Sequence, residues 1–366
     1  MIETPLRESE AALGAVFGEV AGARLPRHYG DPPAEYHAAR EAVGVADRSD
    51  LAHVRLWGKE PARMLHGLIT NDLLGAPSGR GVYAAMLTPK GRMIAELRAF
   101  VLPRAGGTEV LVELPREALD GTVAHLKKFV PPMFARWADV SEEVGTVGCY
   151  GPRARELLTR VLDAEVPALD EDAFLEASFG SERVLTAGSR YTGEPGFDLT
   201  AASTVLPALW DSLLAEGADL GVRSVGFGTL ETLRIEAGRP RYGAELTEET
   251  IPTEAYESTG QMKRAISFTK GCYTGQEVIV RIAHRGHVNR HLRGLLLGDV
   301  PTPAPRTPLF HPESGKEVGW TTSAAASPLR AQTIALAYLR REVAPGDTVR
   351  LGAAEGAEGR VVEVPF

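Results

Sequence analysis

The chain has 366 residues, of which 44% are apolar and 24% charged, and its formal net charge is −8. A chain of this length exceeds what one hydrophobic core usually supports, so we expect two or three domains. The acidic balance argues against a general nucleic-acid binder, and two cysteines are too few for a disulfide framework, which favours the reducing cytoplasm.

Several other classes of protein are disfavoured by the motifs that the sequence lacks. The N-terminal stretch "MIETPLRESE" has neither the basic region nor the apolar region of a signal peptide. No apolar run approaches the roughly 18 residues that a membrane span needs. Zinc-binding spacings and the phosphate-binding G-x-x-x-x-G-K-[ST] loop are also missing. We therefore expect no membrane partner, no direct nucleic-acid binding and no bound metal.

The first part of the chain alternates between strands and helices. Residues 1–50 predict an initial helical segment, an irregular stretch rich in Pro, Gly and Tyr, and a short helix at residues 34–42. The run "HVRLWGKEPARMLHGL" predicts a strand, a glycine turn and a helix with Pro61 in its first turn, where proline is tolerated. "GVYAAMLTPKGRMIAELRAFVL" predicts a hairpin that turns at "TPKG", and "TEVLVELPREALDGTVAHLKKFV" predicts a strand followed by a helix.

A second round of similar elements begins near residue 144. "VGTVGCYGPRARELLTRVL" predicts a strand and a helix, "ERVLTAGSRYTGEPGFDLTA" a hairpin, and "TVLPALWDSLLAEGA" a helix that stops at Gly217. Two such rounds indicate an α+β protein with two α+β units of similar build. Cys149, at a strand-to-helix turn of the second round, is expected to be a small core hydrophobe.

Cys272 stands in a different context, "TKGCYTGQEVIV" at residues 269–280. Thr274 and Glu277 have the spacing of an N-terminal capping box, and the apolar residues after them repeat at helical spacing, which predicts a helix start. The positive end of the helix dipole and Lys270, two residues from the cysteine, would both favour a thiolate. These residues alone leave open whether Cys272 is reactive or is a buried cysteine beside an ordinary cap.

From about residue 292 the chain turns to short β-rich runs separated by Gly, Pro and polar clusters, which predict a small β-barrel or sandwich. The preceding stretch, residues 281–293, contains four Arg and three His. It is either a solvated connector or a docking surface for a polyanionic tail or an acidic partner.

Several of these motifs resemble a known family. "KGCYTGQE" (270–277) resembles the signature octet of the YgfZ-type folate-binding proteins. The wider chain is similar to the T-protein of the glycine cleavage system, the tetrahydrofolate-dependent aminomethyltransferase. The matching pieces cover nearly the whole length and include "RYTGEPGFDL" (190–199), "ETLRIEAGRPRYGAEL" (231–246) and "EVGWTTSAAASPLRAQTIALAYL".

The resemblance implies a three-domain cloverleaf, in which two ferredoxin-like α+β units and a C-terminal β-barrel surround a central channel that holds a reduced folate. The first unit would be discontinuous and would comprise residues 1–50 and 141–244. The second unit would comprise residues 51–140 and 245–283, and the barrel residues 284–366.

The resemblance also implies a set of site residues. Glu194 stands where a T-protein motif has a pterin-binding glutamate, with Tyr191 beside it, and a carboxylate can accept both the amino group and the ring N–H of a pterin. Glu96 stands at the place of the catalytic aspartate, so its carboxylate is moved by one methylene, and small misplacements at a reacting group are costly. Leu230 replaces an arginine of a further motif, whereas Arg234 is retained as a candidate for folate binding.

In the YgfZ-like branch, activity depends on the cysteine of the octet. The resemblance therefore makes Cys272 the leading catalytic candidate, with Lys270 as a charge that lowers its pKa. It implies a cytoplasmic, tetrahydrofolate-binding accessory protein that supports iron–sulfur cluster assembly or repair, and so tRNA modification. Its partners would be a reduced folate, as tetrahydrofolate or a one-carbon derivative, and iron–sulfur client enzymes.

Two alternatives stay open. The first is a tetrahydrofolate-dependent aminomethyltransferase of the glycine cleavage system, with a lipoyl carrier protein as its partner and Glu96 in catalysis. The second is a folate-independent scaffold that retains only the fold.

Overall fold

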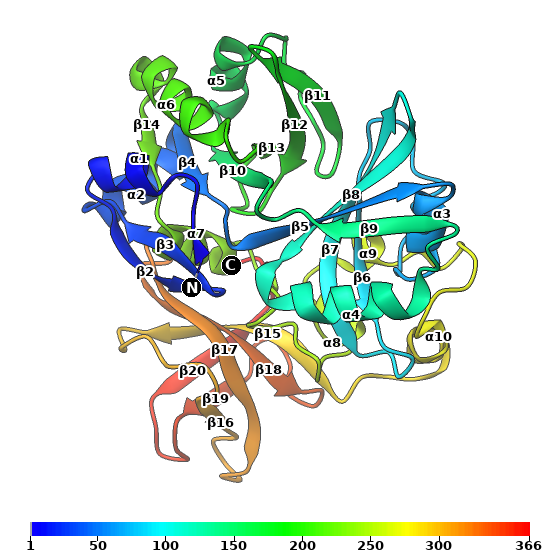
Figure 1. Ribbon diagram of the computed structural model, residues 1–366. Helices are drawn as coiled ribbons and strands as arrows, with labels where there is room; N and C mark the ends of the chain where they lie inside the picture. The colour runs from blue at the N-terminus through cyan, green and yellow to red at the C-terminus, as the bar shows by residue number, and fades with distance from the viewer. Residues whose placement is uncertain (1) are drawn as a thin grey trace.

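The computed structural model describes residues 2–366, apart from the side chain of Arg285. Two large β-sheets with their helices, a small N-terminal sheet and a C-terminal barrel are arranged around a common centre (Figure 1). The predicted α+β class is confirmed, and so is the β-rich C-terminal part.

The N-terminal segment builds a three-stranded sheet in the order β1-β3-β2. Its elements are β1 (Ile2–Glu3), α1 (Arg7–Ala12), β2 (Val16–Val20) and β3 (Ala23–His28), followed by α2 (Pro32–Glu41). The predicted short helix is confirmed as α2, where Asp31 Oδ1 accepts a hydrogen bond from the N–H of Ala34 at 3.1 Å. The irregular stretch expected before this helix is wrong in part, because β3 pairs with β2 along most of its length.

The first large sheet has six strands in the order β11-β12-β13-β10-β4-β14. Its strands are β4 (Val43–Asp47), β10 (Val144–Tyr150), β11 (Phe174–Phe179), β12 (Glu182–Ser189), β13 (Gly196–Ala202) and β14 (Val222–Ser224). The helices α5 (Ala154–Val161) and α6 (Leu206–Glu216) contact each other and contribute Leu158 and Trp210 to the core of this sheet (Figure 1). β4 pairs with β10 although the whole second sheet lies between them in the chain.

The second large sheet has five strands in the order β6-β7-β8-β5-β9. Its strands are β5 (Leu51–Gly58), β6 (Val82–Leu87), β7 (Met93–Arg104), β8 (Gly107–Pro115) and β9 (Ala135–Asp139). The predicted hairpin is confirmed as β6 and β7, and Gly91 closes its turn at φ 72°, with its N–H donating to the carbonyl of Thr88 at 2.9 Å. The helices of this part are α3 (Pro61–His66), the 3-10 helix η1 (Arg116–Ala118), α4 (Leu119–Phe129) and α9 (Met262–Ala265).

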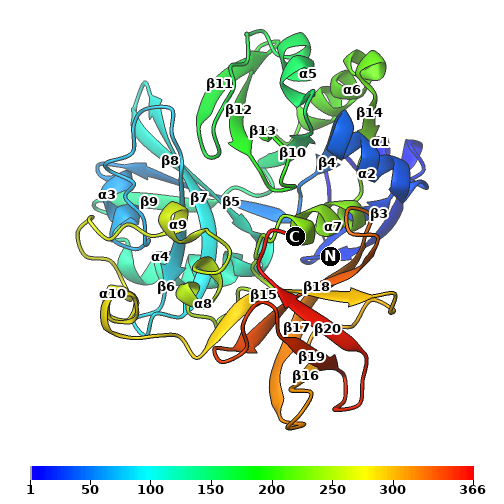
Figure 2. The ribbon, with the colours of Figure 1, turned by 180° about the vertical axis from the view of Figure 1, so that it is seen from behind.

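A buried helix joins the N-terminal segment to the barrel. After the 3-10 helix η2 (Ala218–Leu220), the chain forms α7 (Phe227–Glu236), which lies near the centre in both ribbon views (Figures 1 and 2). It contacts β3, α2 and the barrel strand β17. Two of its charged side chains, Arg234 and Glu236, are fully buried, so both must find partners inside the protein.

The structure corrects the predicted start of the helix after Cys272. The segment that follows α7 contains α8 (Pro252–Tyr256) and α10 (Gln276–Arg285). Gly275 is the N-cap of α10, at φ 83° and without a side-chain cap, so Thr274 and Glu277 do not form the expected capping box. Glycine is needed here because a Cβ atom would lie 2.6 Å from the carbonyl oxygen of Thr88, in the β6–β7 turn.

The C-terminal part is a closed barrel with the strand order β15-β18-β17-β16-β19-β20 (Figure 2). Its strands are β15 (Arg290–Gly298), β16 (Pro308–Phe310), β17 (Glu317–Ser327), β18 (Gln332–Arg340), β19 (Thr348–Leu351) and β20 (Glu358–Val362). Alternating residues such as Leu295, Ala335 and Val361 fill its interior, as expected for strands with one face inward.

In the part of the chain that is described, no helix combines the length and the apolar character needed to cross a bilayer. The domain boundaries expected near residues 50, 141, 245 and 284 stay a prediction.

Candidate functional site

A central cavity of about 100 Å³ lies where the two large sheets meet the segment after α7. Its lining is rich in charged side chains, which is unusual for a protein interior. The arginines that line it are Arg48, Arg98, Arg239, Arg241 and Arg264. The carboxylates that line it are Asp50, Glu96, Glu113, Glu171 and Asp198.

Strand geometry explains why several of these charges meet. Glu96 and Arg98 are two residues apart on β7, so their side chains point to the same face of the sheet. Arg98 is paired in register with Glu113 on β8, which brings the two side chains together. Asp198 comes from β13 of the other large sheet. The cavity therefore lies between the inner faces of two sheets.

An ion pair crosses from one sheet to the other. Arg98 Nη2 lies 2.5 Å from Glu113 Oε1 and 2.6 Å from Asp198 Oδ2. Burial alone would raise the pKa of Glu113, but the charges of Arg98 and His53 more than offset it, so the pKa of Glu113 lies well below its usual range. The guanidinium lies between the two carboxylates and supplies the partner that buried charges require.

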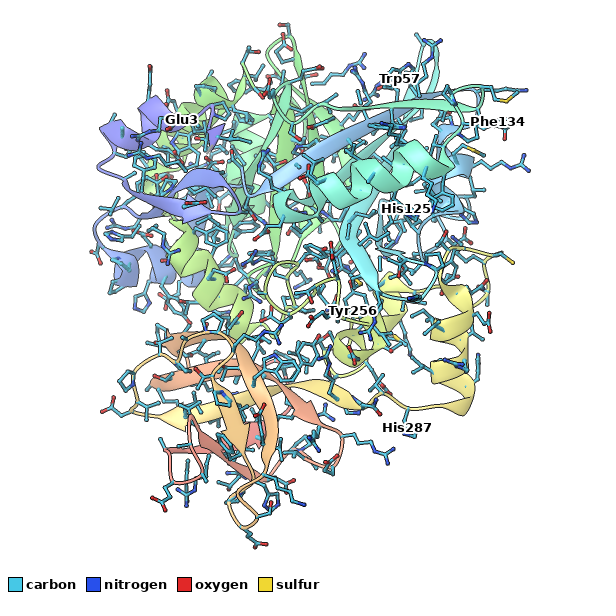
Figure 3. All side chains as sticks on the ribbon, turned by 60° about the horizontal axis from the view of Figure 1, so that its bottom comes forward. Glu3, Trp57, His125, Phe134, Tyr256 and His287 are labelled. Atoms are coloured by element: carbon cyan, nitrogen blue, oxygen red, sulfur yellow. The ribbon has the colours of Figure 1, made fainter. Side chains whose placement is uncertain are left out.

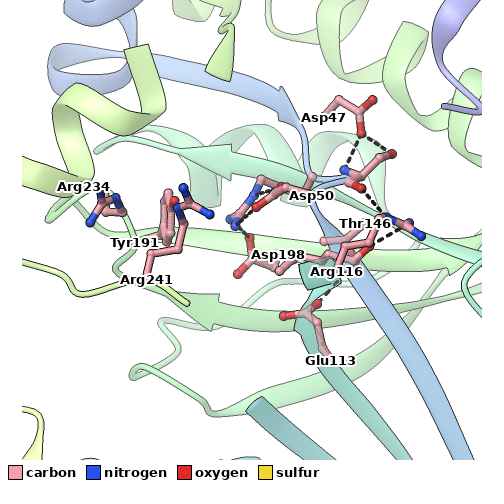
Figure 4. A network of polar contacts seen from close by, with 12 residues as sticks. Asp47, Asp50, Glu113, Arg116, Thr146, Tyr191, Asp198, Arg234 and Arg241 are labelled. Atoms are coloured by element: carbon pink, nitrogen blue, oxygen red, sulfur yellow. Dashed lines mark hydrogen bonds and ion pairs between the residues drawn. The ribbon is translucent and has the colours of Figure 1, made fainter. Parts of the chain in front are cut away.

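A second arginine fixes the other wall of the cavity. Arg48 binds Asp50 in a bidentate manner, at 2.9 and 3.1 Å, and donates to the Tyr150 hydroxyl at 2.6 Å. Tyr150 donates in turn to Asp198 Oδ1 at 2.5 Å. Figure 4 shows Asp50 and Asp198 next to each other in this network. The Arg48 guanidinium also lies 4.2 Å from the ring centroid of Tyr191, which lines the same cavity.

Glu96 differs from the other carboxylates of the cavity in its partners. Its Oε1 accepts a hydrogen bond from the N–H of Tyr242 at 2.7 Å, and its Oε2 accepts one from the Tyr83 hydroxyl at 2.6 Å. Burial raises the pKa of Glu96, and the hydrogen bonds from Tyr83 and Tyr242 oppose this rise in part. A carboxyl group with a raised pKa holds its proton more readily than an exposed carboxyl group does, which makes Glu96 a candidate for acid–base catalysis.

Two larger cavities adjoin the central one. A cavity of about 540 Å³ shares Tyr83, Glu171 and Arg264 with it. A cavity of about 660 Å³, next to the barrel, shares Arg241 with it. The central cavity alone is too small for a ligand of drug size, which usually needs about 300 to 1,000 Å³, whereas each of the two neighbouring cavities has a volume in that range.

The structure places Glu194 and Arg234 away from this cavity. Glu194 lies in the turn between β12 and β13, where its Oε1 accepts a hydrogen bond from Arg40 Nη1 at 2.9 Å. Arg234 is fully buried and pairs with Glu231 and Glu245, both at 2.9 Å. Neither Glu194 nor Arg234 is among the described residues that line the central cavity. Of the residues expected in the site, the structure brings together Glu96 and Tyr191.

Cys272 and Lys270 lie at a different place on the molecule. The Cys272 side chain is exposed. Lys270 Nζ donates to the backbone carbonyls of His66, Ile69 and Asn71, the last two at 2.8 and 3.1 Å. Burial lowers the pKa of Lys270 to about 8, against the opposing charge of Asp72. The ammonium group thus ties the segment around Cys272 to the loop after α3.

Cys149 is fully buried in the core of the six-stranded sheet, and burial raises the pKa of its thiol. Within the described residues, no group of three or more His, Cys, Asp and Glu side chains is placed to hold a metal ion.

Of the ten charged residues that line the cavity, sequence reasoning named only Glu96 and missed the other nine. Five of the missed residues lie on or beside the strands of the two large sheets: Arg48, Asp50, Arg98, Glu113 and Asp198. A signal was present, because a charged letter inside an otherwise apolar strand marks a buried charge that needs a partner, as in "AELRAF", "LVELP" and "GFDLTA".

Two family models match the chain. The model described as "GCVT N-terminal domain" matches residues 6–270, and the model described as "Glycine cleavage T-protein C-terminal barrel domain" matches residues 290–366. Together they cover most of the sequence.

Curated relatives match over the full length. A protein named aminomethyltransferase from Moorella thermoacetica is 30% identical over 366 residues, which is 100% of this chain and 97% of the relative. A second aminomethyltransferase, from Saccharopolyspora erythraea, is 31% identical over 369 residues, again 100% of this chain and 97% of the relative.

One solved structure shares the whole fold. It is the glycine cleavage system aminomethyltransferase T from Bartonella henselae, with a TM-score of 0.87 at 22% identity, over 100% of this chain and 98% of the other. At this level of identity the likeness shows a common fold.

Proposed function

The chain belongs to the glycine cleavage T-protein family, and we propose that it is a tetrahydrofolate-dependent aminomethyltransferase with its reacting centre in the central cavity. The observation that carries the proposal is Glu96, a buried carboxyl group with a raised pKa. It is held by two hydrogen bonds and lines the same cavity as Glu113, whose pKa is lowered by the charge of Arg98. Two carboxyl groups in such different surroundings can have different roles, one as a proton carrier and the other as a fixed charge.

The residues of the cavity fit a reduced folate. A pterin offers an amino group and a ring N–H on one edge, and a fixed carboxylate can accept both. Asp198 is the best candidate for this role, because it lines the cavity and its position is fixed by Tyr150 and Arg98. The Tyr191 ring supplies an aromatic wall, and the adjoining cavity of about 540 Å³ leaves room for the rest of the molecule. Bound tetrahydrofolate would supply the amine that accepts the one-carbon unit.

Glu96 would manage the proton of the transfer. The transfer breaks the bonds of the one-carbon unit to the carrier sulfur and to its amino nitrogen and forms two bonds to nitrogens of the folate. The two N–H protons that the folate loses must reach the carrier thiol and the departing ammonia. Glu96 Oε2, hydrogen-bonded to Tyr83, is the cavity atom that can hold such a proton. Glutamate carries its carboxyl one methylene further than the aspartate expected in this family, and Tyr83 and Tyr242 fix where that longer side chain ends.

The test is a glycine-cleavage assay with an aminomethylated lipoyl carrier protein and tetrahydrofolate. Glu96→Gln should lower the rate of ammonia release on the order of 100-fold, as expected for loss of a general acid–base group, and change the Kd of tetrahydrofolate only a few-fold. Glu10→Gln is the matched control, because Glu10 is also a buried glutamate but does not line the central cavity. A wild-type chain that binds folate without turnover would contradict the proposal.

A second candidate function has its own observation. The octet around Cys272 resembles that of the YgfZ-type proteins, and the sulfur of Cys272 is exposed, so it is free to meet a partner. This favours a folate-binding accessory factor of iron–sulfur enzymes. Both cysteines are free, which supports action in the cytoplasm.

The second candidate is tested by complementation of a deletion strain. Cys272→Ala should fail to restore the activity of iron–sulfur enzymes while its tetrahydrofolate affinity stays near that of the wild type. Full restoration by this variant would reject a role for the thiol and leave the transferase as the function.

A further inference from the structure

A chain of three side chains runs from the protein interior to the central cavity. Tyr256, at the end of α8, is fully buried, and its Oη lies 3.1 Å from the Oη of Tyr83 on β6. The Tyr83 hydroxyl donates to Glu96 Oε2 at 2.6 Å. Tyr83 and Glu96 line the cavity, whereas Tyr256 is not among the described residues that do so. Figure 3 shows Tyr256 near the middle of the molecule.

The direction of the hydrogen bonds in this chain follows from a count of protons. Each hydroxyl has one proton to donate. While Glu96 is ionised, Tyr83 donates its proton to the Glu96 carboxylate, so Tyr256 must be the donor between the two tyrosines. When Oε2 of Glu96 carries a proton and donates it to Tyr83, the Tyr83 hydroxyl must turn its own proton to Tyr256. The polarity of the chain is therefore linked to the protonation state of Glu96.

Other charged and titratable groups face this chain from the elements packed around it. They are Arg98 on β7, Glu113 on β8, Arg241 after α7, Arg264 on α9 and Tyr338 on β18. Arg241 and Arg264 act on Glu96 as fixed charges, since their guanidinium groups are held by Glu117 at 3.2 Å and by Asp172 at 2.7 Å. The two tyrosine hydroxyls can rotate, so they can follow the proton of Glu96.

We propose that Tyr256 is a positioning residue that sets, through Tyr83, how readily Glu96 takes up and releases a proton. The proposal rests on the proposed function only in that Glu96 is the proton carrier there. Without the Tyr256 hydroxyl, Tyr83 has no acceptor for its proton when Glu96 is protonated, and a buried donor without a partner is costly. With Glu96 ionised, the same loss only weakens a bond that Tyr83 still makes. Removal of the hydroxyl therefore disfavours protonated Glu96.

Infrared titration of the wild-type chain and the Tyr256→Phe variant tests the proposal without any ligand. The carbonyl band of protonated Glu96 is assigned by its loss in Glu96→Gln. In Tyr256→Phe, the midpoint of this band should move down by about one pH unit, which corresponds to about 1.4 kcal/mol. Tyr29→Phe is the matched control, because it removes a hydroxyl that donates to another buried glutamate, Glu10, at 3.2 Å. Its midpoint for the Glu96 band should stay at the wild-type value.

A double variant shows whether the effect passes through Tyr83. In a Tyr83→Phe background, Tyr256→Phe should move the midpoint no further, because the link between Tyr256 and Glu96 is already broken. The proposal would be overturned if Tyr256→Phe moved the Glu96 midpoint as far in the Tyr83→Phe background as it does in the wild-type chain. It would also be overturned if Tyr256→Phe alone left the midpoint unchanged.

Should Tyr256→Phe fail to fold, incorporation of 3-fluorotyrosine at position 256 gives the answer. Fluorination keeps the shape of the ring but makes the hydroxyl a stronger donor and a weaker acceptor, so the Glu96 midpoint must still fall. A midpoint that does not move would overturn the proposal in this form as well.

The failure of this inference can be told apart from the failure of the proposed function. If the infrared midpoint shifts but the wild-type chain shows no turnover, the proposed transferase activity is wrong and the role of Tyr256 stands. If the wild-type chain shows turnover and the acid limb of its pH–rate profile stays at the same pH in Tyr256→Phe, the role of Tyr256 is wrong and the transferase activity stands.

Discussion

Glu10 is a second buried carboxyl group whose proton matters, although it lies outside the lining of the central cavity. Its side chain, on α1, is fully buried and accepts a hydrogen bond from the Tyr29 hydroxyl at 3.2 Å. Burial, and after it the negative charge of Asp47, raises the pKa of Glu10 from an ordinary value of 4.5 to about 9. Glu10 therefore carries its proton at neutral pH in the folded protein and releases it on unfolding.

This difference predicts how stability depends on pH. The stability that the Glu10 proton contributes is fully present below pH 4.5 and is lost as the pH rises towards about 9. Glu10→Gln should remove this dependence, which amounts to at most about 1.4 kcal/mol per pH unit. In urea denaturation, the free energy of unfolding of Glu10→Gln should rise relative to that of the wild type as the pH of the buffer is changed from mildly acidic to mildly basic.

Glu8→Gln is the control for this prediction, because Glu8 lies on the same helix but is exposed. If Glu10→Gln and Glu8→Gln show the same dependence on pH as the wild type, Glu10 does not hold its proton in the folded state.

At the scale of single elements, local patterns were sufficient where the element is shaped by its own residues. The β6–β7 hairpin follows from two apolar runs and a turn with glycine at the required position, where Gly91 adopts φ 72°. The helix α2 was predicted at residues 34–42 and begins two residues earlier, because Asp31 caps it and prolines are tolerated in its first turn. Neither element depends on a distant part of the chain for its ends.

The start of α10 shows the opposite case. The spacing of Thr274 and Glu277 is that of a capping box, yet Gly275 takes a left-handed conformation and packs on the β6–β7 turn. That turn is far away in the sequence, so no local pattern could reveal the contact. A tertiary constraint has replaced the local signal.

The same contact leads to a prediction for α10. Gly275→Ala should lower the free energy of unfolding by about 1 to 3 kcal/mol, because the added Cβ meets the Thr88 carbonyl oxygen and φ is positive. Gly271→Ala is the matched control, since a Cβ there has nothing within 4 Å and the substitution should be close to neutral. Chemical denaturation of both variants measures the difference. Equal stability of the two variants would show that α10 does not depend on this packing.

At the scale of the whole molecule, local patterns predicted the order of the α+β rounds and the β-rich part along the chain, but not which strands of distant segments pair with each other. Two α+β rounds and a terminal β-rich part follow from patterns along the chain. The pairing of β4 with β10 does not, because the partners are separated by an entire sheet. The resemblance to a known family supplied this long-range information through motifs rather than through local physics.

The residues of the site also fall into those that the resemblance identified and those that it did not. Glu96 and Tyr191, named from the resemblance, do line the cavity. Asp198, four residues after Glu194, was not named from the sequence; it lines the cavity from β13, whereas Glu194 lies in the turn before that strand, which begins at Gly196. The roles of Cys272, Lys270, Glu194 and Arg234 stay predictions.

The ion pair between Arg98 and Asp198 has a consequence for how ligands reach the site. It joins the two sheets across their interface, and both partners are buried. Rocking one sheet away from the other would strand these charges in a dry interior, at a cost of about 3 to 5 kcal/mol. The ion pair therefore holds the two sheets together at the cavity. A ligand must enter through movements of side chains and loops at the edge of the cavity, and not through separation of the sheets.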